Sequence, residues 1–102
     1  EKYGSSATTR KVYLGKAMNY FPKIGVAEFL VETGKVQLGE KVIITGPTTG
    51  VIEAELNEIR VDMDPVRLAR KGERFSTPVP VKVRRSDKMY KIVAREGVSS
   101  EL

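Results

Sequence analysis

The chain has 102 residues, with 18 Lys and Arg against 13 Asp and Glu, which gives a net charge of +5 and a pI near 9.6. It contains no cysteine, histidine or tryptophan. Disulfides, thiolate nucleophiles, Cys/His metal sites and a histidine general base are therefore excluded. The length predicts one domain, and its mix of 40% hydrophobic and 30% charged residues is typical of a folded globular protein. No apolar run approaches the ~20 residues of a membrane span, so we expect no membrane partner.

Both ends of the chain are polar and contain glycine and serine, as linkers and tails do. We predict a linker or tail over residues 1–9, a β-barrel domain over 10–95 and a polar tail over 96–102. Because the sequence begins with Glu1 and shows no signal segment, we expect a fragment of a longer protein.

Short runs of alternating apolar and polar residues predict β-strands. These runs cover residues 12–20 (with a bulge at Gly15), 27–32, 41–45, 51–56 and 79–84. Prolines at 78 and 80 place the last strand at an edge or at a strand start, because proline cannot donate a ladder hydrogen bond. Residues 46–50 (GPTTG) are a predicted hairpin turn. They do not form a phosphate loop, which needs four residues between its glycines and a helix after it. Here three residues separate Gly46 from Gly50, and a strand is predicted next.

One segment has helical signals. Asp64 is a candidate cap, Pro65 suits the first helical position, and Gly72 suits a stop. That is at most one or two turns. The sequence therefore predicts an all-β fold, a small distorted antiparallel β-barrel with at most one short helical turn.

Catalytic chemistry finds little support in the sequence. One window of the sequence holds five carboxylates and a single opposing arginine; the carboxylates are Glu53, Glu55, Glu58, Asp62 and Asp64. Glu53 and Glu55 share the outward face of a predicted strand, where a charged side chain is normally solvated. No serine has a lysine three residues later. We therefore predict no catalytic, cofactor-binding or metal-binding residue in this chain.

Charge is segregated along the sequence. Residues 65–95 carry ten basic and two acidic side chains, a local net charge of +8, which leaves −3 elsewhere. This is typical of a surface for nucleic acid or an acidic partner, although a solvated edge strand would look the same. The candidate binding surface comprises Arg67, Arg70, Lys71, Lys82, Arg84, Arg85, Lys88, Tyr90 and Lys91, with Tyr90 as a stacking side chain.

Residues 34–46 (GKVQLGEKVIITG) resemble the second-domain barrel of translation factors such as elongation factor Tu, and residues 69–73 (ARKGE) supply a second element of that pattern. Gly39 would permit the tight turn. The side chains expected to fill the barrel interior are Val36, Leu38, Val42 and Ile44.

A longer match covers most of the predicted domain. It runs through residues 15–17 (GKA), Tyr20, 25–28 (GVAE), 38–40 (LGE), 46–50 (GPTTG), 58–62 (EIRVD) and 83–91 (VRRSDKMYK). In this order the segments resemble the C-terminal domain of the collagenase-like peptidase family U-thirty-two.

The resemblance implies a role as an accessory domain. Members of that family carry an N-terminal catalytic domain followed by a small β-barrel and are classed as peptidases or collagenases. The chain would then be a cytoplasmic, non-catalytic domain that recruits protein substrate or packs on its own catalytic domain. Some relatives instead hydroxylate tRNA or rRNA bases, using a cysteine-ligated iron–sulfur cluster. An RNA-binding barrel is therefore the alternative, and without cysteine any such cluster would belong to the absent catalytic domain.

Overall fold

The alternating segments of the sequence form β-strands in the computed structural model, which describes residues 9–94. Within this range there are ten strands and no helix, so the all-β prediction is confirmed. No helix in the described part is long and apolar enough to cross a membrane. The strands are β1 (Thr9–Phe21), β2 (Val26–Val31), β3 (Lys35–Gln37), β4 (Lys41–Gly46), β5 (Gly50–Glu55), β6 (Ile59–Val61), β7 (Asp64–Val66), β8 (Leu68–Arg70), β9 (Arg74–Pro78) and β10 (Lys88–Ala94). The predicted terminal tails fall almost wholly outside the described residues.

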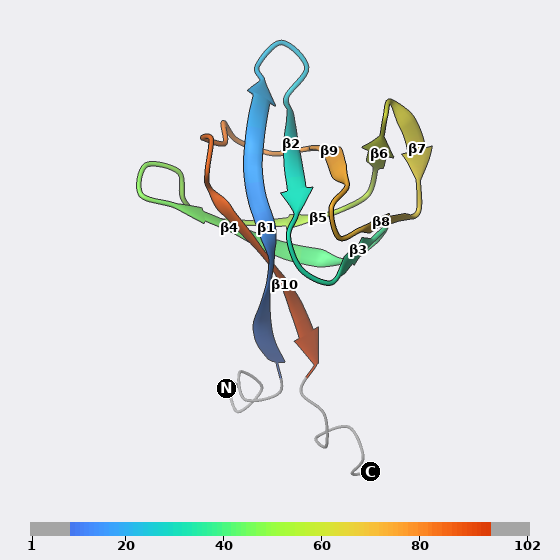
Figure 1. Cartoon of the computed structure of the whole chain (residues 1–102). Helices are drawn as coiled ribbons and strands as arrows, with labels where there is room; N and C mark the ends of the chain where they lie inside the picture. The colour runs from blue at the N-terminus through green and yellow to red at the C-terminus, as the bar shows by residue number, and fades with distance from the viewer. Residues whose placement is uncertain (1–8, 95–102) are drawn as a thin grey trace.

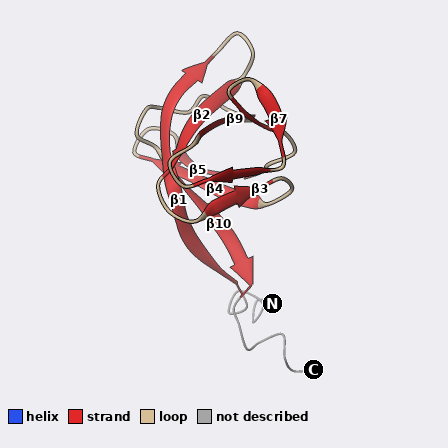
Figure 2. Ribbon diagram, turned by 45° about the vertical axis from the view of Figure 1, so that its right-hand side comes forward, coloured by secondary structure: helices blue, strands red, loops and turns tan. Residues whose placement is uncertain are grey.

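Eight strands form one antiparallel sheet in the order β5-β4-β10-β1-β2-β9-β6-β7, and β3 pairs with β8 in a separate ladder. The sheet coils around the core (Figures 1 and 2). Its edge strands β5 and β7 are not paired with each other, so the barrel is open. The ladder between β9 and β6 is a single pair, Arg60 with Ser76, which makes this the weakest seam of the sheet.

Apolar side chains from both halves of the sheet meet in one core. The rings of Phe29 and Phe75 stack with centroids 5.7 Å apart, and Leu14, Ile44 and Met89 are fully buried around them. The predicted interior positions Val36, Val42 and Ile44 are buried, as expected. Leu38 is not: it follows β3 in the tight turn at Gly39 (φ 91°), and its side chain is exposed.

The helical prediction for residues 64–72 is wrong. Asp64–Val66 instead pairs with Ile59–Val61 across a two-residue turn, and Leu68–Arg70 pairs with β3. Proline at the second position of β7 is tolerated because β7 is an edge strand. Pairing with distant strands thus overrides a short local helical signal.

The strand predicted over residues 79–84 is also wrong. The strand lies earlier, at Arg74–Pro78, where it pairs with β2. Pro78 ends it, and the next residues form a loop in which Val83 is buried as an apolar anchor. The alternating valines at 79, 81 and 83 therefore belong to a loop at the edge of the core and not to a strand.

The predicted bulge at Gly15 is confirmed, since the β1–β10 register shifts between Tyr13 and Gly15. The backbone of β2 passes close by: a Cβ atom on Gly15 would lie 1.8 Å from the Leu30 carbonyl oxygen. A backbone oxygen held in the sheet cannot move aside as a flexible side chain could.

We predict that Gly15→Ala lowers the free energy of unfolding by roughly 3 kcal/mol, because the added methyl group overpacks a site walled by backbone. Gly39→Ala is the matched control: its φ of 91° is unfavourable for alanine, but nothing lies within 4 Å of the new methyl group. Its cost should be about 1 kcal/mol. Urea unfolding of both variants measures the difference, and equal costs would contradict the close-approach argument.

Candidate interaction surfaces

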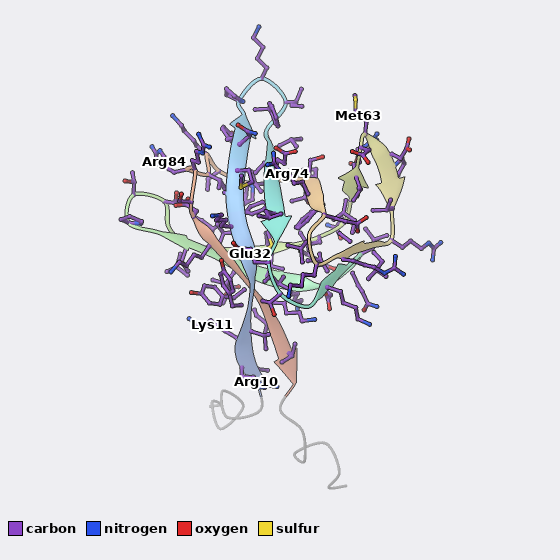
Figure 3. All side chains as sticks on the ribbon, in the orientation of Figure 1. Arg10, Lys11, Glu32, Met63, Arg74 and Arg84 are labelled. Atoms are coloured by element: carbon purple, nitrogen blue, oxygen red, sulfur yellow. The ribbon has the colours of Figure 1, made fainter. Side chains whose placement is uncertain are left out.

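The structure divides the predicted basic surface between two regions. Arg67 joins β7 to β8, while Arg70 ends β8 and Lys71 follows it. The other residues belong to the loop between β9 and β10 or to β10 itself; they are Lys82, Arg84, Arg85, Lys88, Tyr90 and Lys91. In Figure 3, Arg84 lies on the side of the molecule away from β8. Arg84 thus lies away from the β8 residues, whereas Lys91 on β10 contacts Lys35, the ladder partner of Arg70.

Lys91 is committed to contacts inside the fold. Its Nζ donates to the Lys35 carbonyl oxygen at 3.3 Å and lies 3.8 Å from Glu40 Oε2. These contacts tie β10 to β3 and to the turn that follows it. Lys91 is therefore less available to a partner than a freely solvated lysine would be.

Tyr90 belongs to an aromatic and basic cluster on the outer face of the sheet. The Tyr13 ring meets it edge-on with centroids 5.6 Å apart, and Lys11 Nζ lies 5.3 Å from the Tyr90 centroid. Lys88 is opposite Lys16 on β1. The sequence did not indicate Tyr13 and Lys11 because they are far from Tyr90 along the chain. The Lys11 ammonium group lies over the ring that was expected to stack on a base.

The Tyr13 hydroxyl donates a hydrogen bond to Glu32 Oε1. Burial raises the pKa of Tyr13 to about 12, with further contributions from this hydrogen bond, the charge of Glu32 and, last, the neighbouring Tyr90. The phenol therefore remains a neutral donor through the physiological range. Glu32 also lies 3.9 Å from Lys16 Nζ, so the carboxylate links the aromatic pair to the basic side chains.

A buried carboxylate holds the basic loop in place. Asp87 is only 3% exposed; it accepts hydrogen bonds from the Thr49 hydroxyl and, at 2.9 Å, from the Arg84 backbone N–H. The residue before it donates its N–H to the Ala17 carbonyl at 2.9 Å. Gly46 lets the carboxylate approach, because a Cβ there would lie 1.9 Å from Asp87 Oδ1. The predicted 46–50 hairpin turn, which is confirmed, is thus packed against the 84–87 loop.

A groove lies between the tips of two hairpins, β1–β2 and β6–β7. Its volume is about 670 Å³, and an adjoining hollow of about 350 Å³ shares five of its lining residues. Three large apolar side chains line it while exposed to solvent: Phe21 (44%), Ile24 (70%) and Met63 (85%). We call this feature the hairpin groove. The sequence does not reveal the groove, because exposed apolar residues near turns resemble core residues.

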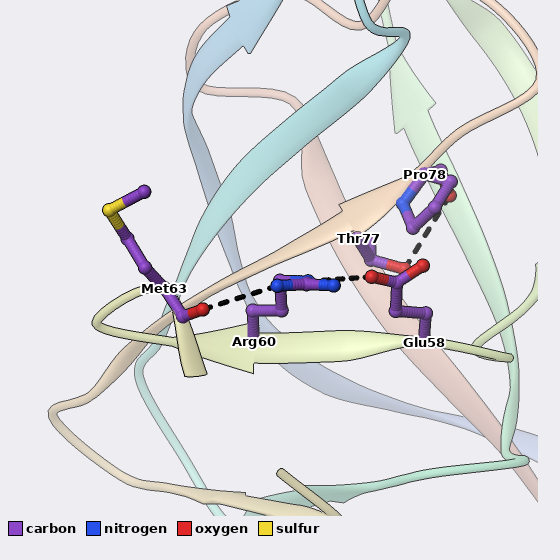
Figure 4. Close-up of polar contacts among 5 residues, drawn as sticks. All are labelled: Glu58, Arg60, Met63, Thr77 and Pro78. Atoms are coloured by element: carbon purple, nitrogen blue, oxygen red, sulfur yellow. Dashed lines mark hydrogen bonds and ion pairs between the residues drawn. The ribbon is translucent and has the colours of Figure 1, made fainter. Parts of the chain in front are cut away.

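Arg60 braces one wall of the hairpin groove (Figure 4). Its Nε donates to Glu58 Oε2 at 2.6 Å, and its Nη1 donates to the Met63 carbonyl oxygen at 3.2 Å. The turn it supports has two non-glycine residues with positive φ, Asp62 at 52° and Met63 at 69°. This geometry matches the sheet twist but normally favours Asn and Gly.

The described surfaces are suited to binding. Among residues 9–94, no group of three acidic side chains is placed to hold a metal ion. The acidic window of the sequence is spread over β5, the residues on either side of β6 and the start of β7, with Glu53 and Glu55 exposed on β5 as predicted. What the fold does bring together is an apolar groove on one side and an aromatic–basic face on another.

No protein-family model matches the chain. Among curated proteins, a collagenase of Porphyromonas gingivalis strain W83 is 50% identical over 95 residues, which are 93% of this chain and 23% of that protein. An uncharacterized protease of Methanocaldococcus jannaschii is 30% identical over 87 residues, 85% of this chain and 21% of that protein. The chain thus spans about a quarter of the length of these relatives.

The chain is also similar to solved structures of a peptidase C-terminal domain. The C-terminal domain of a U32 peptidase of Geobacillus thermoleovorans superposes with a TM-score of 0.73 at 18% identity, covering 78% of this chain and 91% of that domain. The resemblance to the U32 C-terminal domain is confirmed. The selenomethionine variant of that domain gives a TM-score of 0.71. The fold of that domain is therefore the fold of about three quarters of this chain.

We predict that Asp87→Ala lowers the free energy of unfolding by about 2–3 kcal/mol, because the Arg84 N–H and the Thr49 hydroxyl lose a charged acceptor in a buried position. Glu53→Ala, on the exposed face of β5, is the control and should change stability by less than about 0.5 kcal/mol. Thermal and urea unfolding measure both. An Asp87 variant as stable as the wild type would show that the carboxylate does not hold the loop.

We predict a stability contribution from Tyr13 that disappears at high pH. The native state keeps the Tyr13 proton to about pH 12, whereas the unfolded chain releases it near pH 10. The contribution is therefore complete below pH 10 and is lost as pH rises towards 12. Tyrosinate absorbance, with Tyr13→Phe to assign the signal, follows the titration. Glu32→Gln should move the pKa of Tyr13 back towards 10, and an unchanged titration would contradict the assignment.

Proposed function

We propose that this chain is a non-catalytic accessory domain of a collagenase-like peptidase and that it recruits protein substrate to a separate catalytic domain. The observation that carries the proposal is its 50% identity, over nearly its whole length, to a segment of a protein named collagenase. A domain that makes up 23% of such a protein leaves most of it for catalysis. The chain has neither histidine nor cysteine to act as base or nucleophile.

The arrangement of the described strands favours recruitment. β1 begins and β10 ends side by side, since Thr9 is the ladder partner of Ala94. The hairpin groove is at the other end of the molecule, beside the tips of β1–β2 and β6–β7 (Figure 1). A catalytic domain joined near either terminal strand would leave this groove accessible.

The alternative of an RNA-binding barrel has weaker support from the surface. It rests on the net charge of +8 over residues 65–95 and on the translation-factor-like pattern. The basic residues are spread over the β8 region, the β9–β10 loop and β10, with Arg84 on the side away from β8 (Figure 3), and Lys11 and Tyr13 contact the Tyr90 ring. On the favoured proposal the chain itself needs no cofactor, and the catalytic groups are those of another domain.

We expect the purified chain to hydrolyse neither gelatin nor fluorogenic peptides. Removing the matching segment from the Porphyromonas gingivalis collagenase should raise KM for gelatin at least fivefold, because the recruiting surface is lost. The kcat/KM for a short peptide should stay unchanged, since short substrates need only the catalytic site. Circular dichroism controls for folding of the truncated enzyme. Hydrolysis by the isolated chain, or an equal loss on both substrates, would contradict the proposal.

A further inference from the structure

We propose that the hairpin groove binds an extended, apolar segment of an unfolded polypeptide. The inference rests on the proposed function and specifies the substrate class that the domain recruits. Its anchors are Phe21, Ile24 and Met63, contributed by two hairpins that are distant in sequence.

The exposed apolar side chains are the first support. Ile24 and Met63 are 70% and 85% exposed, and both line the same groove as Phe21. Large apolar side chains that gather at one concave site mark a place where another molecule binds. Scattered singly over the surface they would need no explanation.

Backbone strain at the groove wall is the second support. Met63 occupies a left-handed conformation (φ 69°) that glycine or asparagine would adopt at lower cost. The fold thus tolerates strain in order to project this side chain outwards. Arg60 donates a hydrogen bond to the Met63 carbonyl, so the turn that carries the side chain keeps its shape before a partner binds.

The shape of the site suits an extended chain. β9 is fully paired to β2 along one edge, but its other edge meets β6 only at Arg60 and Ser76. Arg74, which lines the groove, therefore lies on a strand edge that is largely open. An extended peptide can run along such an edge and place alternate side chains in the hollow. A volume of about 670 Å³ accommodates several of them.

Charge at the groove argues for a polypeptide over a polyanion. Its titratable lining residues are Glu28, Asp62 and Glu73 against Arg60 and Arg74, a local charge of −1 in a chain of net +5. Arg60 is already paired with Glu58. These carboxylates would repel a nucleic acid or a sulfated polysaccharide, whereas they would not repel a neutral or mildly basic peptide.

Methionine NMR tests the proposal directly. The chain has three methionines; Met63 is in the groove and Met89 in the core, so ¹³C-methyl labelling supplies a probe and an internal control. The ligand is reduced, carboxamidomethylated ribonuclease A, and native ribonuclease A is its folded counterpart. We expect the unfolded form to shift the Met63 methyl signal and leave the Met89 signal in place. The native form should shift neither. A Met63 signal that ignores the unfolded form, or that responds equally to polyuridylate, would overturn the proposal.

Variants separate binding from folding. Ile24→Glu and Met63→Glu should weaken binding of the unfolded ribonuclease at least tenfold. Val51→Glu, at an equally exposed apolar position (71%) on β5 outside the groove, should leave it unchanged. Met63→Gly removes the strained side chain, so it should raise Tm while weakening binding. A loss of binding with Val51→Glu as large as with Ile24→Glu would overturn the assignment.

Failure here is distinguishable from failure of the proposed function. If the groove variants bind normally while the truncated collagenase still loses affinity for gelatin, the groove is the wrong surface and recruitment stands. If the truncated enzyme keeps its KM for gelatin, recruitment is wrong, whatever the isolated chain binds.

Discussion

The Asp87 carboxylate is the contact on which the arrangement of strands depends. It is buried where three segments meet: the 46–50 turn through Thr49, the 84–87 loop through the Arg84 N–H, and β1 through backbone hydrogen bonds with Ala17. Burying a carboxylate is costly unless donors surround it, and here a hydroxyl and an amide supply them. The same contact explains why position 46 is glycine. Because it fixes where β10 begins, it also helps to set β10 between β1 and β4.

The other side of the sheet is held differently. β10, β1, β4 and β2 share long ladders, whereas the β6–β7 hairpin joins β9 through a single pair. Regions with few backbone pairs open at lower free energy than the rest of a domain. The hairpin groove lies at this seam. The firmly paired half of the sheet therefore supports a β6–β7 hairpin that can shift as a unit against β9, which suits a site for polypeptides of varied sequence.

Local patterns in the sequence were sufficient for some elements and misleading for others. Alternation predicted β2, β4 and β5, and glycine spacing predicted the 46–50 turn, because both signals act between neighbouring residues. The helix at 64–72 and the strand at 79–84 failed because distant pairing decided those segments. The basic residues follow one another in sequence, but Arg84 lies on the side of the molecule away from β8 (Figure 3). The groove had no local signal at all, since Phe21, Ile24 and Met63 meet only after two hairpins fold.

Folding alone gives no reason for the residue at position 63. The core does not use it, the turn would form more easily with glycine, and its side chain is exposed. Gly15 and Gly46, by contrast, are explained fully by the close approach of backbone or carboxylate. A fold shared at 18% identity shows that few positions are needed to define this sheet. Positions that carry a cost the sheet does not require are therefore the ones to consider for function. Of the three non-glycine residues with positive φ among residues 9–94, Asp62 and Met63 line one groove, while Ser86 lies in the loop that Asp87 holds.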